Sequence, residues 1–117
     1  MSDTTGRKIS FGPNSPILLL GTGESDLDCN NTMFAKVIDG NVTFTTSDVP
    51  VIGAYMMTIK LNVVSGSVTW FSNVYWPNDT VPPLTVGESH LFSFFTSDGG
   101  NTWYGSSLDN YATLEGN

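Results

Sequence analysis

The chain has 117 residues, of which 39% are hydrophobic and 13% charged, and eleven acidic against four basic side chains give a net charge of −7. A chain of this length forms one domain with a single modest core. The acidic balance repels phosphate backbones, which argues against nucleic acid as a partner. No apolar stretch is long enough to cross a bilayer and no signal peptide is recognisable, so we expect a soluble protein without a membrane partner.

The N-terminal segment, up to Ser15, differs in composition from the rest of the chain. It is polar, rich in Gly, Ser and Thr, and followed directly by Pro16. Such segments extend from a domain and order on a partner's surface. The sequence therefore predicts an extended N-terminal arm over residues 1–15 and a single domain over residues 16–117.

A period of two dominates the chain after the arm. In the run AYMMTIKLNVV, alternate residues fall on one face of a half-buried antiparallel strand. The residues expected on that face are Tyr55, Met57, Ile59, Leu61 and Val63. No window of a dozen residues shows the helical period of 3.6, so almost no helix is expected.

Turn signals recur at short, regular intervals between the predicted strands. Asp39-Gly40 lies between two apolar-rich runs and predicts a β-hairpin, because Gly accepts the positive φ of a primed turn. Ser65-Gly66 predicts a second turn, and Trp76-Pro77-Asn78-Asp79 a third. This spacing predicts an all-β fold, a single antiparallel β-sandwich or Greek-key, jelly-roll-like domain.

The sequence contains no set of residues that specifies catalysis or metal binding. Its one histidine, His90, is expected at the surface or a strand end, and its one cysteine, Cys29, in the core. One histidine and one cysteine cannot supply the four ligands of a tetrahedral zinc site. The run at 26–31 spaces oxygen ligands like a calcium loop but has Asn31 where Gly is needed, which favours a solvated acidic loop. We expect no cofactor, no metal and no enzyme, although the carboxylates leave glycoside hydrolysis as a remote alternative.

The stretch HLFSFFTSDGGNTWYG combines the densest aromatic run with a clear turn. Its first half predicts a buried strand over 91–95, and Asp98-Gly99-Gly100 predicts the turn that follows. Because neighbours on a strand face opposite sides, we expect Trp103 to point inward and Tyr104 outward. The rings serve core packing or, at Tyr104, a platform for a partner.

Residues 68–104 contain a run of motifs that resembles a pattern in bacteriophage virion proteins, found at the ends of tail fibres and in small structural or decoration proteins. The matching pieces are Trp76-Pro77, Pro83-Leu84-Thr85, the apolar strand 91–95 and DGGNTWYG at 98–105. The resemblance implies a virion β-sandwich assembled in the host cytoplasm, and it brings no catalytic residues.

The expected function that follows is a capsid decoration (cement) protein on the capsid surface. Its partners would be the major capsid protein and further copies of itself, as a homotrimer, a form that decoration proteins of this type often take. The alternative is a host-recognition module of a tail or head fibre that binds glycan. Candidate partner-binding residues are Arg7, Lys8, Phe11, Trp76, Asp98, Asn101 and Tyr104.

Overall fold

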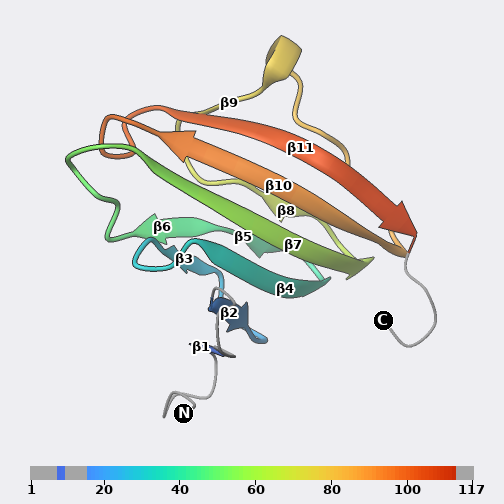
Figure 1. Cartoon of the computed structure of the whole chain (residues 1–117). Helices are drawn as coiled ribbons and strands as arrows, with labels where there is room; N and C mark the ends of the chain where they lie inside the picture. The colour runs from blue at the N-terminus through green and yellow to red at the C-terminus, as the bar shows by residue number, and fades with distance from the viewer. Residues whose placement is uncertain (1–7, 10–15, 113–117) are drawn as a thin grey trace.

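The computed structural model describes residues 8–9 and 16–112, and these residues form β-strands joined by loops (Figure 1). The only helical segment among them is a short 3-10 turn, η1 (Pro77–Asp79). The predicted all-β class is therefore confirmed. The strands are β1 (Lys8–Ile9), β2 (Ile17–Leu20), β3 (Asp26–Asp28), β4 (Met33–Asp39), β5 (Val42–Thr43), β6 (Thr45–Ser47), β7 (Tyr55–Ser65), β8 (Val68–Thr69), β9 (Val74–Tyr75), β10 (Glu88–Thr96) and β11 (Trp103–Ala112).

The main sheet has seven strands in the order β1-β2-β4-β7-β10-β11-β9. Strands β2, β4 and β7 run parallel, whereas β10 is antiparallel to both β7 and β11. The expectation of a purely antiparallel sheet is wrong, because the first half of the chain returns through the other layer before each new strand is added. Greek keys are built from antiparallel strands, so this parallel half departs from that topology as well.

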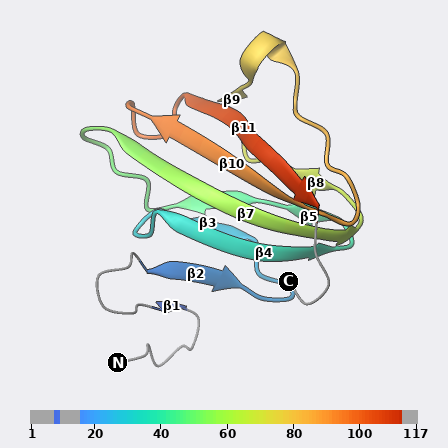
Figure 2. The ribbon, with the colours of Figure 1, turned by 45° about the vertical axis from the view of Figure 1, so that its right-hand side comes forward.

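Two short parallel sheets, β3-β6 and β5-β8, lie behind one face of the main sheet (Figures 1 and 2). The core fills the space between the layers. Its largest fully buried side chains include Phe34, Ile59, Phe92 and Trp103 from the main sheet and Phe44 from the segment joining β5 to β6. The strand predicted over residues 54–64 is confirmed as β7, with the expected five residues buried along one face.

The hairpin predicted at Asp39-Gly40 is wrong. Gly40 does adopt a positive φ of 106°, but the chain bends there from the main sheet into the second layer. Strand β5 pairs with β8 instead of folding back on β4. The physical reason is burial: β4 and the segment after Gly40 each carry inward apolar residues, so they face each other across the core as an arch.

Two such arches, well separated in the sequence, stack on each other. The first contains DGNVTF at 39–44 and the second SGSVTW at 65–70. Their backbones are joined position by position, with Gly40 N donating to Ser65 O at 3.1 Å and Phe44 N to Thr69 O at 2.9 Å. Phe44 and Trp70, at equivalent positions, stack with ring centroids 5.3 Å apart. This repeat aligns β4 with β7 and thereby builds the parallel half of the sheet.

The last two long strands form the antiparallel half. Strands β10 and β11 pair across the predicted turn at 98–100, so the hairpin expected there is confirmed. Within the predicted buried strand, Phe92 and Phe94 are buried, while Leu91, Ser93 and Phe95 are half-buried on the outer face. Of the predicted arm, only Lys8–Ile9 lies within the described residues, where it pairs with β2 at one edge of the sheet.

Candidate functional site

An apolar surface lies at one end of the outer face of the main sheet. The strand registers place Tyr75 opposite Tyr104, Tyr104 opposite Phe95 and Phe95 opposite Met56, in one row across four strands. Tyr75 and Tyr104 are 63% and 56% exposed, and Met56 is also exposed. Their two rings lie 6.2 Å apart at an angle of 50°. The sheet thus presents a continuous apolar row to solvent.

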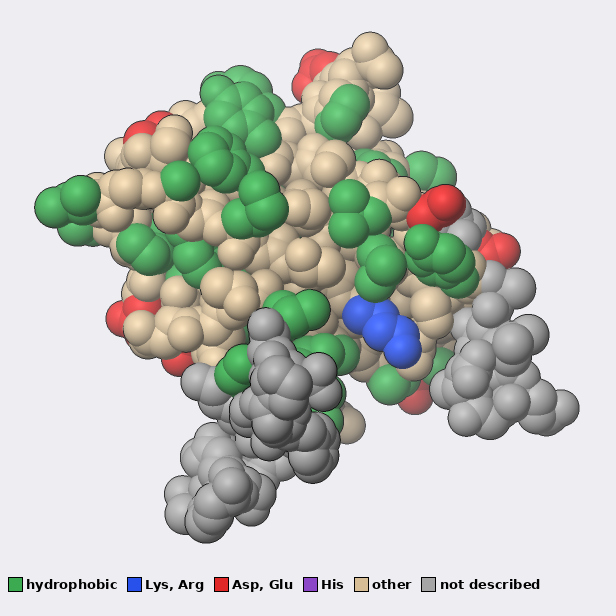
Figure 3. Space-filling view, viewed as in Figure 1, with side chains coloured by type: hydrophobic (Ala, Val, Ile, Leu, Met, Phe, Trp, Pro, Cys, Tyr) green, Lys and Arg blue, Asp and Glu red, His purple; other side chains and the backbone are tan. Residues whose placement is uncertain are grey.

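The loop between β6 and β7 extends this row. Val51 and Ile52 in that loop are 81% and 88% exposed, the highest values among the large hydrophobic side chains that the structure describes. A Cβ built on Gly99 would lie 3.5 Å from the Val51 Cα, so the loop contacts the β10–β11 turn. Hydrophobic side chains gather at this end of the face, at the left of Figure 3. We call the surface made by Val51, Ile52, Met56, Tyr75, Phe95 and Tyr104 the end patch.

The two aromatic residues after the turn lie as predicted. Trp103 is 1% exposed and packs edge-on against Phe71, whereas its neighbour Tyr104 faces solvent in the end patch. Trp76, the other predicted ring of the site, is only partly accessible. It packs against Phe94, 5.6 Å between centroids, and lies directly over Gly105, where a Cβ would come within 2.9 Å of the indole. Trp76 therefore supports the core more than it offers a platform.

Asp98 and Asn101 hold the hairpin turn together. The Asp98 Oδ1 accepts hydrogen bonds from the Thr102 backbone N at 2.9 Å and from the Thr96 hydroxyl at 3.0 Å. The Asn101 Nδ2 donates to the Asp98 carbonyl at 2.9 Å. Both predicted site residues are exposed, but these polar groups already have partners within the turn. Their role in the structure is to fix the turn beside the end patch.

Protonation of Asp98 should loosen this turn. The hydrogen bond from the Thr102 backbone, followed by that from the Thr96 side chain, lowers the pKa of Asp98. A lowered folded-state pKa stabilises the fold above the ordinary carboxyl pKa of about 3.9, and the contribution is lost as pH falls through the folded value. We expect Asp98→Asn to be less stable than the parent at pH 6 and equal to it near pH 2 in urea unfolding. A difference that persisted unchanged at pH 2 would contradict this assignment.

Of the predicted arm residues, the structure describes only Lys8, and it lies apart from the end patch. Lys8 belongs to β1, at the opposite edge of the main sheet from β11 and β9. Arg7 and Phe11 lie outside the described residues. Among the described candidate residues, the structure brings together Tyr104 and the turn that carries Asp98 and Asn101.

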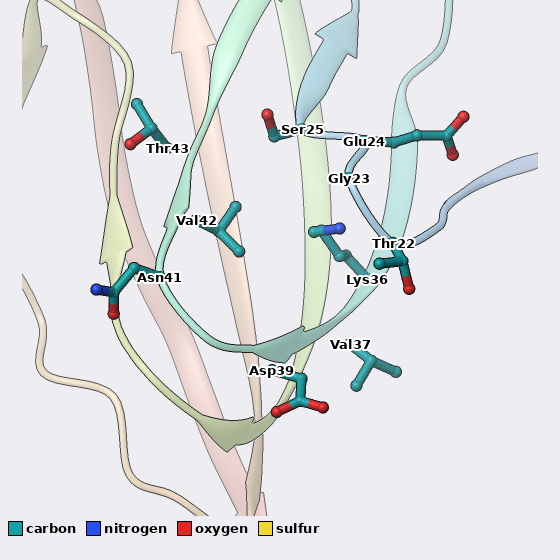
Figure 4. Close-up of a pocket in the computed structure, with 10 residues that line it drawn as sticks. All are labelled: Thr22, Gly23, Glu24, Ser25, Lys36, Val37, Asp39, Asn41, Val42 and Thr43. Atoms are coloured by element: carbon teal, nitrogen blue, oxygen red, sulfur yellow. The ribbon is translucent and has the colours of Figure 1, made fainter.

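A second surface feature is a hollow of about 320 Å³ where the β2–β3 loop meets the β4–β5 arch. Figure 4 shows the Lys36 side chain extending among the residues that line it. Lys36 is buried, and its Nζ donates to the Gly21 carbonyl at 2.7 Å. The Glu24 carboxylate accepts from the Gly21 backbone N at 2.7 Å, so both side chains tie down one loop. This arrangement accounts for the lysine as a structural group.

The lone histidine was expected at the surface or at a strand end; it lies near the start of β10 but not at the surface. His90 is 2% exposed, and its Nε2 accepts a hydrogen bond from the Thr85 backbone N at 3.0 Å. The reason is strand parity, because His90 lies two residues before the inward Phe92. Cys29 is buried as predicted, and burial raises the pKa of its thiol. In the acidic run, Asp26 accepts from the Thr45 hydroxyl at 2.8 Å, and no cluster of metal-binding side chains was found among the described residues.

A scan of protein-family models, a search of curated proteins and a search of solved structures found no match to this chain. Among the residues that the structure describes, no helix is long and apolar enough to cross a membrane.

Of the six residues of the end patch, sequence reasoning named only Tyr104 as a partner-binding residue. Val51 and Ile52 stand in PVIG, between Pro50 and Gly53, and two exposed β-branched residues between turn formers are a signal that could have marked a loop tip. Met56 alternates with the predicted inward residues of its strand, but it was not named as a contact residue. Tyr75 needs the parallel pairing of β9 with β11 to reach Tyr104, and no local pattern indicates that pairing.

Proposed function

We propose that the protein is a non-enzymatic structural component of a bacteriophage particle, and most specifically a capsid decoration protein that binds the major capsid protein. The two layers would form a β-sandwich whose outer face docks on the capsid surface. The resemblance over residues 68–104 supports this origin. A large exposed apolar patch with a polar surround is typical of a protein interface in a soluble protein.

The end patch is the observation that carries the proposal. Its rings and the Met56 side chain come from four strands of the main sheet, and Val51 and Ile52 come from the β6–β7 loop, so it presents a firm apolar surface with a projecting tip. Contacts of this kind need no catalytic residues. On a symmetric shell, the weak affinities of many identical contacts combine by avidity. Aromatic residues near the centre of an interface contribute most of the binding energy.

Replacing the tip of the end patch should weaken capsid binding. We expect the parent protein to co-sediment with purified undecorated capsids at micromolar concentration. Ile52→Asp should bind about 5- to 30-fold more weakly, the loss expected for one well-buried contact residue.

Val86→Asp is the matched control, because Val86 is 60% exposed but lies beside the start of β10, at the other end of that strand from Phe95. Absence of binding by the parent at saturating concentration would overturn the proposal. Equal losses in the two variants would exclude the end patch as the contact surface.

A glycan-binding module of a tail or head fibre is the second candidate. The two exposed tyrosine rings of the end patch favour it, since sugar rings pack on such faces. Under this function Tyr104→Ala abolishes binding to host cells while the fold survives. A decoration protein shows no cell binding to lose, so binding of the parent protein to cells separates the two.

A further inference from the structure

Within residues 8–9 and 16–112, the two edges of the main sheet leave backbone groups available for pairing. Strand β9 covers β11 only at Trp103 and Tyr104, so residues 105–108 have a strand partner on one side only among the described residues. No loop in the described part of the chain supplies a backbone hydrogen bond to that stretch. At the opposite edge, β1 is the last strand of the sheet. Exposed strand edges are templates for pairing with another chain.

The directions of the edge strands are complementary. Strand β1 is antiparallel to β2, and β2 is parallel to β4 and β7. Strand β10 is antiparallel to β7, and β11 is antiparallel to β10. Strand β11 therefore runs in the same direction as β7 and β2. A second copy placed beside the first with the same face outward therefore brings its β1 antiparallel to β11, the pairing that is more stable per residue.

The positions along the two edges also match. The strand registers connect β1 to β11 through one row that runs across the sheet. The members of this row are Lys8, Leu18, Phe34, Ile59, Phe92 and Ser107. A neighbouring copy without axial shift thus places its β1 within the uncovered stretch 105–108, beyond the two residues that β9 covers.

Charge supports the same contact. Residues 1–15 carry two basic and one acidic residue, whereas the remaining chain carries two basic and ten acidic residues. Two surfaces of the acidic body repel each other, whereas β1 contains a basic residue, Lys8. Opposite charges across paired strands are favourable and like charges are not.

We infer that β1 of one copy adds to the β11 edge of the next, which extends the main sheet head-to-tail across copies of this chain. This inference deepens the proposed function, because it specifies how decorating subunits contact one another. The contact is heterologous, so it closes into a ring when the rotation between copies permits. Closure would pair β1 and residues 105–108 of β11 in every copy, and the end patches would remain free for the capsid.

The inference is tested by changing the charges on the two sides of the contact and measuring self-association of the full chain without capsids. We expect the parent protein to associate in sedimentation velocity at about 100 µM. Ser107→Lys places a positive charge in the row of Lys8 and should weaken association about two- to fivefold per contact. Combining it with Lys8→Glu should restore association. Thr43→Lys, the same charge change at an exposed position of β5 in the other layer, should have no effect.

Three results would overturn the inference. A monomeric parent at that concentration excludes the contact. Association that Ser107→Lys leaves unchanged places the contact elsewhere. Failure of Lys8→Glu to restore association indicates that two β11 edges pair with each other. Thermal melts of each variant confirm that the fold is retained. Capsid co-sedimentation is measured separately, so failure of this contact is distinguishable from failure of the proposed function.

Discussion

Gly66→Ala is expected to unfold the protein or to destabilise it by at least about 4 kcal/mol, which is exceptional for a single substitution. A Cβ at Gly66 would lie 2.0 Å from the carbonyl oxygen of Gly40, where the second arch rests on the first. The obstacle is backbone, which cannot rotate away as a side chain does. Moving it would break the hydrogen bonds that join the arches, including Gly40 N to Ser65 O.

Gly87→Ala separates this clash from the cost of the backbone conformation. Gly66 and Gly87 have φ of 86° and 90°, but nothing lies within 4 Å of a Cβ at Gly87. The control should therefore lose only about 1–2 kcal/mol, the cost of a left-handed conformation for Ala. Urea unfolding monitored by tryptophan fluorescence measures both. Equal losses in the two variants would show that the arches do not stack as described.

Trp103→Ala is expected to cost about 3–5 kcal/mol, the range for removing a buried aromatic side chain and leaving a cavity. Its indole lies between Tyr55, 6.0 Å away between ring centroids, and Phe71, 5.2 Å away. It therefore joins β7 in the main sheet to the segment that follows β8 in the second layer. Its loss weakens the contact between the two layers.

Tyr104→Ala is the adjacent control. Tyr104 is the next residue of the same strand but faces solvent, so its replacement should change stability by no more than about 0.5 kcal/mol. The same pair separates stability from binding, because only Tyr104 belongs to the end patch. The two free energies of unfolding come from urea titration at pH 7. A large loss at Tyr104 together with a small loss at Trp103 would mean that the register of β11 is wrong.

The stability of the arches also bears on the proposed capsid contact. The end patch is assembled from the loop before β7, from β7 itself and from the β9–β11 region, which are far apart in sequence. Their arrangement depends on the register that the stacked arches give to β4 and β7. Binding to capsids should therefore be lost in Gly66→Ala together with the fold, whereas in Ile52→Asp it should be weakened with the fold intact.

Local sequence determined which way most side chains point. Alternation predicted the buried face of β7 and the opposite orientations of Trp103 and Tyr104, because successive residues of any strand face opposite sides whatever its partner. The turn at 98–100 was predictable for a similar reason, since glycines at adjacent positions permit the backbone that a tight turn needs. The same alternation, extended back from Phe92, would have placed His90 inside.

Only the tertiary structure decided which strands pair, and therefore where the sheet ends and what its surface offers. Asp39-Gly40 has the local signature of a hairpin, but the free energy gained by closing an arch over the core outweighs that preference. The repeat of DGNVTF as SGSVTW was a visible signal, yet its meaning depends on stacking between segments that are distant in the sequence. Strand pairing is a long-range choice made by burial and backbone hydrogen bonding together, so the end patch and the two sheet edges were set by the fold and not by any short motif.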